Sequence, residues 1–482
     1  MGAGRAVAVG GGGRDAAWQG REWSSGLSWV ERDVVRVAAE PGFGRWLEQV
    51  KGTGGCGQPV YLAGYSMVVD AGSGEVLRYF GTVGEPGGRL AVRCGNRRES
   101  RCASCSREHA GDTWHLVAAG LGGGKGVPSS VVSHPRVLVT LTAPGFGVVH
   151  RAGRCVRAGA GVCEHGRPVG CGGWHADGAG VVGEPLCRGC YDYAAHVLWH
   201  AMLGELWSRT VRGVRRALAA AGGVPRSRLG ECLRVSFAKV AEYQKRGAVH
   251  VHAVIRLDGP DGPGSPPPAW ATGSVLDAAV RAAAGKASVR TPYAPEVGAL
   301  TCRWGRQLDV HPILDQSAAD GALSGEAVAG YVAKYTSKSV GDSGGSDHPV
   351  RSWADLVSRR VSGHVRALMA ACWRLGAVAE LAGLRLRTWC HMLGFRGHVL
   401  TKSRRYSTTY TALRGARAAF RSAPAVGGNT VTVSSWRFVG AGHSPGEAEF
   451  ARGVWLDRMQ ARALAAEAER GGGGGWWVGR GG

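Results

Sequence analysis

The stretch GAVHVHAVIRL, residues 247–257, has the composition of a buried β-strand but carries two histidines. Successive side chains of a strand point to opposite faces, so His250 and His252 share one face and the apolar residues between them occupy the other. Two neutral imidazoles on one face can lend lone pairs to a single divalent cation. The same pattern also fits two hydrogen-bonded histidines in a half-buried sheet, and the stretch alone leaves both interpretations open.

A second strand-like run, CLRVSFAKVAEYQ, precedes the histidine strand, and a turn near Lys245–Gly247 predicts that the two form a β-hairpin. Glu242 and Gln244 lie on the incoming strand and can reach the face of the histidines. A carboxylate oxygen beside two ring nitrogens suits Mn²⁺ or Mg²⁺. We therefore expect Glu242 to complete a divalent-metal site with His250 and His252, with Gln244 as the other candidate.

A helix with tyrosines and lysines on one surface follows about 80 residues later. Ser324 is a plausible N-cap for this helix, and four side chains at helical spacing cluster along GYVAKYTSK: Tyr331, Lys334, Tyr335 and Lys338. A phenol with a pKa of about 10 is a poor nucleophile, but a neighbouring ammonium group or metal offsets that. An amphipathic helix with its tyrosines in the core and its lysines in solvent is the alternative.

Three motifs thus occur in a fixed order: the strand RVLVTLTAP (136–144), the histidine hairpin and the tyrosine helix. This order resembles that of the HUH endonuclease superfamily, which is named for its His–hydrophobic–His element. The segments HPRVLVTLTAPGFGVVH, AEYQKRGAVHVHAVIRLDG and YVAKYTSK are similar to the replication initiators of actinobacterial rolling-circle plasmids. The resemblance covers roughly residues 90–425.

The resemblance implies an α+β fold, with a ferredoxin-like palm whose antiparallel sheet carries the metal. It also implies a site-specific endonuclease that nicks single-stranded plasmid origin DNA to start rolling-circle replication. By this analogy Tyr335 is the main nucleophile and Tyr331 the second, and the products are a 5′-phosphotyrosine and a free 3′-OH for a host polymerase. Lys334 and Lys338 would steady the phosphate charge.

Thr140 and Thr142 of the first motif are expected to lie beneath the site. Two alternatives stay open. A conjugative relaxase or transposase would use the same chemistry, although relaxases usually carry three histidines and a tyrosine near the N-terminus. A zinc-dependent DNA-binding regulator would use no catalytic tyrosine.

Thirteen cysteines in a chain with no secretory signal indicate metal ligands or free thiols rather than disulfides. Two clusters contain CxxC pairs, which are half-sites for structural zinc. The first is Cys94, Cys102 and Cys105, for which Cys56, His109 or His115 could be the fourth ligand. The second is Cys163, Cys171, Cys187 and Cys190, with Cys155, His165 and His175 as further candidates.

The net charge of +23 favours a polyanionic partner such as nucleic acid. From Arg385 to Arg421 there are nine Lys or Arg residues and no acid, interleaved with aromatic rings. Rings can stack on unpaired bases while cations follow the phosphates, so the densest part is expected to bind DNA: Lys402, Arg404, Arg405 and Tyr406. A solvated basic face is the alternative.

The chain lacks a phosphate-binding loop of the GxxxxGK[ST] type, so unwinding would require a host helicase. No run of 18 apolar residues occurs, and a cytoplasmic location without membrane contact is expected. Composition suggests five regions: a glycine-rich, poorly ordered segment (1–55), a cysteine-cluster region (56–130), a nuclease domain with a cysteine-rich insertion at about 150–195 (131–345), a basic, partly helical DNA-binding region (346–425) and a C-terminal segment with a glycine-rich tail (426–482).

Overall fold

The computed structural model describes residues 26–156, 161–314, 324–336, 346, 348–421 and 429–472. Lys338 and residues 473–482 of the glycine-rich tail lie outside these residues. The chain divides into two compact units, one formed by residues 1–107 with 422–482 and the other by residues 108–421. Residues 56–107 of the cysteine-cluster region and the C-terminal segment therefore belong to one unit, and the basic region up to residue 421 shares the other unit with the histidine hairpin.

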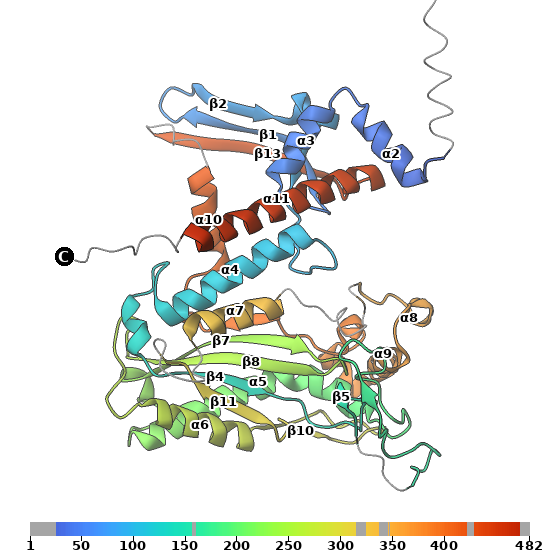
Figure 1. Cartoon of the computed structure of the whole chain (residues 1–482). Helices are drawn as coiled ribbons and strands as arrows, with labels where there is room; N and C mark the ends of the chain where they lie inside the picture. The colour runs from blue at the N-terminus through green and yellow to red at the C-terminus, as the bar shows by residue number, and fades with distance from the viewer. Residues whose placement is uncertain are drawn as a thin grey trace, which may run out of the picture. The chain divides into compact units, whose positions relative to one another are not determined.

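A five-stranded antiparallel sheet forms the centre of the unit 108–421 (Figure 1). Its strand order is β11–β4–β8–β7–β12, and its strands are β4 (Arg136–Leu141), β7 (Arg234–Tyr243), β8 (Val249–Asp258), β11 (Leu308–Pro312) and β12 (Leu400–Lys402). The predicted hairpin is confirmed as β7 and β8. Gly247 takes a φ of +74° in its turn, a conformation that glycine adopts without strain.

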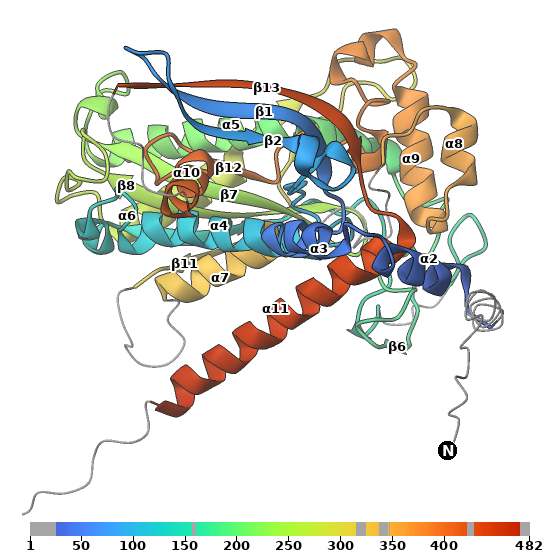
Figure 2. The same ribbon diagram turned by 90° about the horizontal axis from the view of Figure 1, so that it is seen from above.

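Helices cover both faces of this sheet (Figure 1). The long helix α5 (Tyr193–Ala221) and α6 (Gly273–Lys286) pack on the face that carries Val139, Val251 and Ala253. Helix α7 (Gly325–Thr336) and the second half of α4 (Ala103–Gly122) pack on the face that carries Val240 and Val254. Figure 2 shows α4 and α7 beside each other above the strands. Leu203, Trp207, Val214 and Leu218 recur at helical spacing along α5 and are all buried.

The remaining helices and strands of this unit are short. They are β5 (Gly153–Arg154), β6 (Trp174–His175), β9 (Ser288–Arg290), β10 (Thr301–Arg303), α8 (Trp353–Ser358), α9 (Gly363–Leu375) and α10 (Tyr410–Arg421). A 3₁₀ segment, Ala379–Leu384, follows α9 in the region 346–425 that was expected to be partly helical.

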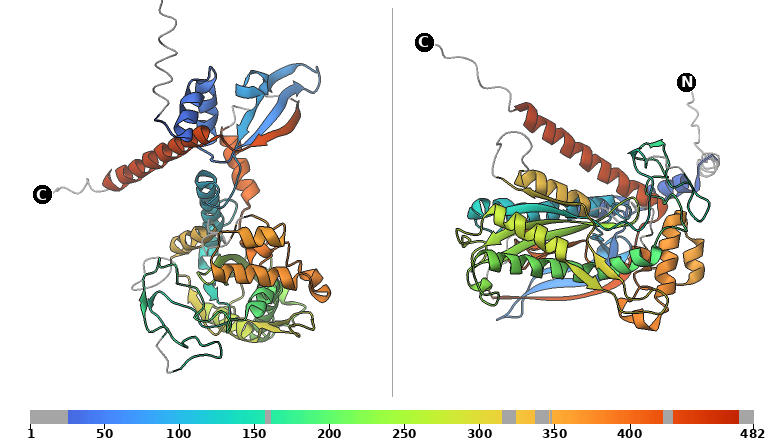
Figure 3. Two further views of the ribbon diagram at one scale, coloured as in Figure 1. Left: turned by 90° about the vertical axis from the view of Figure 1, so that its right-hand side faces the viewer. Right: turned by 90° about the horizontal axis from the view of Figure 1, so that it is seen from below.

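The other unit contains a four-stranded antiparallel sheet of β1 (Val60–Asp70), β2 (Val76–Gly81), β3 (Leu90–Val92) and β13 (Thr430–Ala441). Figure 3 shows β1 paired with β13, so distant parts of the chain fold together. Its helices are α2 (Trp29–Ala38), α3 (Phe43–Gly52) and α11 (Pro445–Gly472).

Residues 1–55 were expected to be poorly ordered, but residues 29–38 and 43–52 of this segment form the helices α2 and α3. Ser28 and Glu31 form a capping box that starts α2. Trp46 and Val50 of α3 are buried against Ala451 of α11, so the helices are stabilised by a small apolar core. Within the part of the chain that the structure describes, no helix is long and apolar enough to cross a membrane.

Candidate active site and metal-binding clusters

Strand pairing brings four polar side chains together on the face of the sheet that α7 covers. Thr140 of β4 lies opposite His252 of β8, and Glu242 of β7 lies opposite His250. The His252 Nδ1 atom is 3.1 Å from Thr140 Oγ1, and its Nε2 atom is 3.1 Å from Glu242 Oε2. Both ring nitrogens of this almost fully buried histidine therefore have partners, which hold the imidazole in one orientation.

Both predicted tyrosines of α7 contact the same imidazole. The Tyr335 ring lies nearly parallel to that of His252, with 5.1 Å between centroids and 18° between planes. The Tyr331 ring meets His252 edge-on at 5.1 Å, and the two tyrosine rings are 4.7 Å apart. The sheet and the helix, some 80 residues apart in sequence, thus converge on one cluster of side chains.

The way in which α7 packs explains why the tyrosines face the sheet. Ser324 Oγ accepts a hydrogen bond from the backbone N–H of Ala327, so the serine caps the first turn as predicted. Val328 and Val332 are buried in the core beneath the helix. Tyr331 and Tyr335, one turn apart, lie along the edge of this apolar stripe, where Tyr331 is 37% exposed.

The second histidine of the pair lies beside the first. The His250 and His252 ring centroids are 6.2 Å apart. Burial, with smaller contributions from His252 and Arg246, lowers the pKa of His250 to about 4. The imidazole is therefore neutral near pH 7, which is the form that binds metals.

The donor set of His250, His252 and Glu242, two nitrogens and one carboxylate, has the chemistry of a site for a divalent cation. Glu242 and His252 already form a close pair in it. In the described structure, however, the ligand atoms of these three residues do not all lie within 4.8 Å of one another, as those of the cysteine–histidine clusters do.

The acid–base state of Tyr331 is set by its surroundings. Burial raises the pKa of the phenol, and a hydrogen bond with Tyr335 and the nearby Glu242 raise it further. Lys334 is exposed on the neighbouring surface of the helix, while Lys338 lies outside the described residues. Removing a proton from this phenol would thus require help from a nearby cation, such as a lysine ammonium group or a metal ion.

A cleft of about 880 Å³ opens beside His250. Arg246 and Arg306 line it, as do Gln244 and residues 147–151 and 182–183 of the cysteine-rich segment. The Arg246 guanidinium donates to the carbonyl oxygens of Ala143 and Pro144, so the arginine is fixed at the wall of the cleft. Thr142, which was expected beneath the site, lines the cleft and donates to the carbonyl oxygen of Gln307.

The first cysteine cluster brings together four side chains that could hold a metal ion: Cys56, Cys94, Cys102 and Cys105. The Cys56 sulfur is 3.8 Å from that of Cys102 and 3.6 Å from that of Cys105. Four sulfurs placed about 2.3 Å from a tetrahedral zinc ion would be about 3.8 Å apart, whereas disulfide sulfurs are about 2.05 Å apart. Hydrogen bonds from the neighbouring thiols, Cys105 first, lower the pKa of Cys102. The cluster fits zinc, and Cys56 would be the fourth ligand.

The second predicted cluster is corrected by the structure, because its cysteines belong to two separate groups. Cys171 joins His150, Cys155 and His175, whereas Cys163, Cys187 and Cys190 join His165. Contacts of 3.3 Å between Cys171 Sγ and His175 Nε2, and of 3.3 Å between Cys190 Sγ and His165 Nδ1, support this division. Both groups are compatible with zinc. His150 was missed because no CxxC pair precedes it.

The predicted DNA-binding residues near position 404 differ in their placement. Arg404 and Arg405 are exposed, and Lys402 donates to the carbonyl oxygen of Ser407. Tyr406 is fully buried, and its hydroxyl donates to the carbonyl oxygen of Val117. A ring in this position packs in the core, so the expectation that Tyr406 stacks on an unpaired base does not fit the structure.

Fold and clusters together define the class of protein: α+β, with antiparallel sheets and cysteine–histidine groups of the zinc-binding type. Residues 42–455 match the family described as RepSA, replication initiator protein, pSAM2, and the chain belongs to this family. It is similar to the replication initiator protein of Streptomyces ambofaciens, with 45% identity over 448 residues that cover 89% of this chain and 94% of that protein. No solved structure matches the chain.

Proposed function

We propose that this replication initiator is an HUH-type endonuclease that nicks one strand of its plasmid origin through a tyrosine. One observation carries the proposal: His252 contacts Tyr331, Tyr335, Glu242 and Thr140 at once. A nucleophile beside oriented metal-binding donors is what in-line cleavage of a phosphodiester needs. In this reading the antiparallel sheet serves as the palm.

Tyr335 is assigned the first step. Its phenol oxygen forms a bond to the scissile phosphorus, and the bond from phosphorus to the 3′ oxygen breaks. The phenol loses its proton, and the leaving 3′ oxygen takes one up to become a 3′-OH, so the step releases no net proton. The strand is then attached through a 5′-phosphotyrosine, and the 3′-OH primes a host polymerase. Tyr331 is assigned the second cleavage, after one round of synthesis, in which its phenol oxygen bonds to phosphorus and a new 3′-OH is freed. This 3′-OH then attacks the first phosphotyrosine, which releases the Tyr335 phenol and closes the displaced strand. Lys334 and Lys338 would offset the charge of the phosphate.

His250, His252 and Glu242 would hold a Mn²⁺ or Mg²⁺ ion, which would supply Lewis-acid polarisation of the phosphate when bound. Thr140 acts on this set by orienting the imidazole of His252. Gln244 remains the other candidate for the third ligand, and in this structure its side-chain oxygen accepts from Arg246.

The cleft beside His250 is the proposed path of the single strand, because Arg246 and Arg306 line it. Residues 182–183, which lie between ligands of the two zinc-type groups, also line it. Zinc in those groups would therefore hold one wall of the path in shape. A host helicase would supply the single strand.

Incubation of supercoiled origin plasmid with the protein and Mn²⁺, followed by denaturing electrophoresis, tests the proposal. Relaxed circles with covalently bound protein are expected. Glu242→Ala should weaken the dependence on metal more than the matched Gln244→Ala variant does, and the reverse order would make Gln244 the third ligand. If the plasmid stays supercoiled with every metal tested, the endonuclease proposal is wrong and the alternative of a non-catalytic DNA-binding protein is favoured.

A further inference from the structure

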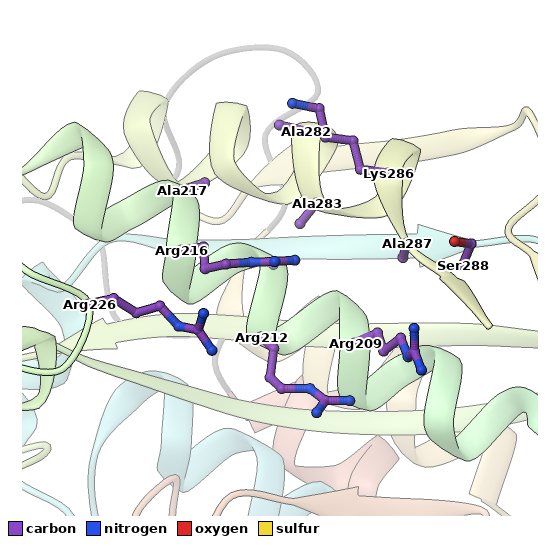
Figure 4. Close-up of a pocket in the computed structure, with 11 residues that line it drawn as sticks. Arg209, Arg212, Arg216, Ala217, Arg226, Ala282, Ala283, Lys286, Ala287 and Ser288 are labelled. Carbon is purple, nitrogen blue, oxygen red and sulfur yellow. The ribbon is translucent and has the colours of Figure 1, made fainter.

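A basic groove runs along the outer side of α5, away from the histidines. Its first part is a cavity of about 640 Å³ between α5 and α6 (Figure 4). Five of the residues that line it carry a positive charge: Arg209, Arg212, Arg216, Arg226 and Lys286. No Asp or Glu is among them.

A second cavity of about 520 Å³ continues the first, because Arg212 and Arg226 line both. It adds four arginines, which are Arg215, Arg234, Arg404 and Arg405, and again no acid. The groove therefore takes cations from two helices, a loop, a strand and the segment after β12. It includes two of the residues predicted to bind DNA, Arg404 and Arg405.

The packing of α5 explains why these cations gather. Arg209, Arg212 and Arg216 recur at helical spacing on the face opposite the buried stripe, so the helix presents them in a row about 10 Å long. Gly213 allows α6 to approach closely, since a Cβ atom there would lie 2.9 Å from the Cβ of Ala283. This contact brings Lys286 to the same cavity.

Few acids neutralise the row. Glu205 pairs with Arg209 at 3.1 Å and with Arg212 at 2.7 Å. Arg216 and Arg226 are exposed and have no ion-pair partner among the described residues. Holding like charges together destabilises a compact state, so a groove of this kind is expected to have a polyanion as its ligand.

The residues that line the groove also distinguish between polyanions. No aromatic ring is among those that line either cavity. Single-strand binding grooves combine cations with rings on which bases stack, whereas duplex binding depends mainly on cations that contact phosphates. Nine cations over two connected cavities also exceed what one small anion requires.

We infer that this groove binds the phosphate backbone of double-stranded DNA, on a surface separate from the histidine–tyrosine site. The two surfaces lie on opposite sides of the five-stranded sheet, because α5 packs on one face and α7 on the other. The inference rests on the proposed function, in that it takes DNA as the substrate. It adds that duplex binding and strand cleavage use different faces of one unit.

Binding of fluorescent DNA to the full-length protein over a range of salt concentrations tests this. The probes are a duplex of arbitrary sequence and one of its strands alone. Each phosphate contact contributes about 8-fold to affinity at 0.1 M salt and about 0.9 to the slope of log K against log salt. Arg216→Ala with Arg226→Ala should therefore weaken duplex binding by roughly 10- to 60-fold and reduce the slope by up to about 1.8.

The matched control is Arg374→Ala with Arg396→Ala, which removes the same charge from exposed positions outside both cavities. The groove variant should lose more duplex affinity than the control, and Arg216→Lys with Arg226→Lys should retain most of it. Equal losses in the groove variant and the control, or a loss confined to the single strand, would overturn the inference. This experiment measures binding and not cleavage. A failure here would count against the groove alone, whereas a failure of the plasmid-nicking assay would count against the proposed endonuclease.

Discussion

Substitution of single cysteines in the segment from residue 150 to 190 should remove zinc ions one at a time. The structure divides eight ligands into two groups, with Cys171 in one and Cys163 in the other, and it adds a third group around Cys56. The purified protein should therefore hold about three zinc ions. Cys171→Ser should lose about one, Cys163→Ser about one, and the double variant about two.

Elemental analysis of the purified variants, set against protein concentration from amino-acid analysis, measures these numbers directly. Cys232→Ser is the matched control, because this cysteine lies outside all three groups and its sulfur only approaches the carbonyl oxygen of Leu229. The reasoning is refuted if a single variant already loses as much zinc as the double variant, since the two groups would then not bind independently.

Three further outcomes are expected. His250→Ala with His252→Ala should abolish nicking but leave the affinity for duplex DNA within about 2-fold, because phosphate contacts elsewhere supply that affinity. A gel of nicked plasmid and a binding titration measure the two properties. Nicking by the double variant would exclude the histidines from the chemistry. Burial lowers the pKa of His200 from 6.5 to about 4, so between these pH values the unfolded state binds a proton that the folded state does not. The free energy of unfolding should therefore fall by about 3 kcal/mol as the pH falls from 6.5 to 4, and it should fall less in His200→Gln. Chemical denaturation over this pH range measures it, and the same pH dependence in both proteins would contradict the assignment to His200. Tyr406→Phe should cost about 1 kcal/mol of stability through loss of the hydrogen bond to Val117 and leave single-strand affinity unchanged, whereas weaker DNA binding at equal stability would restore the surface role of this ring.

The sequence was sufficient to predict the hairpin and the two motifs that meet on it. Alternating apolar residues define the faces of β8, and the spacing of Tyr331 and Tyr335 defines a face of α7. Both patterns are local, because each depends on the geometry of a single strand or helix. Contact between the two motifs was expected only from the family resemblance.

The division of the zinc-type ligands was not predictable in the same way. Pairs of ligands alternate between the two groups along the chain, in the order 150 and 155, 163 and 165, 171 and 175, 187 and 190. Neighbours in sequence therefore belong to different sites, and CxxC spacing does not reveal the assignment. The burial of Tyr406 and the pairing of β1 with β13 were likewise hidden, since both depend on contacts between distant segments.

The central claim is that Tyr335 attacks the scissile phosphate. Peptide mapping of the protein–DNA adduct formed with a single-stranded origin oligonucleotide tests it most directly. The DNA-linked peptide should contain Tyr335, the adduct should be absent in Tyr335→Phe, and it should persist in Tyr331→Phe, which keeps the ring packed against His252. An adduct that maps to Tyr331 and survives Tyr335→Phe would reverse the two roles, and one that maps outside α7 would contradict the account.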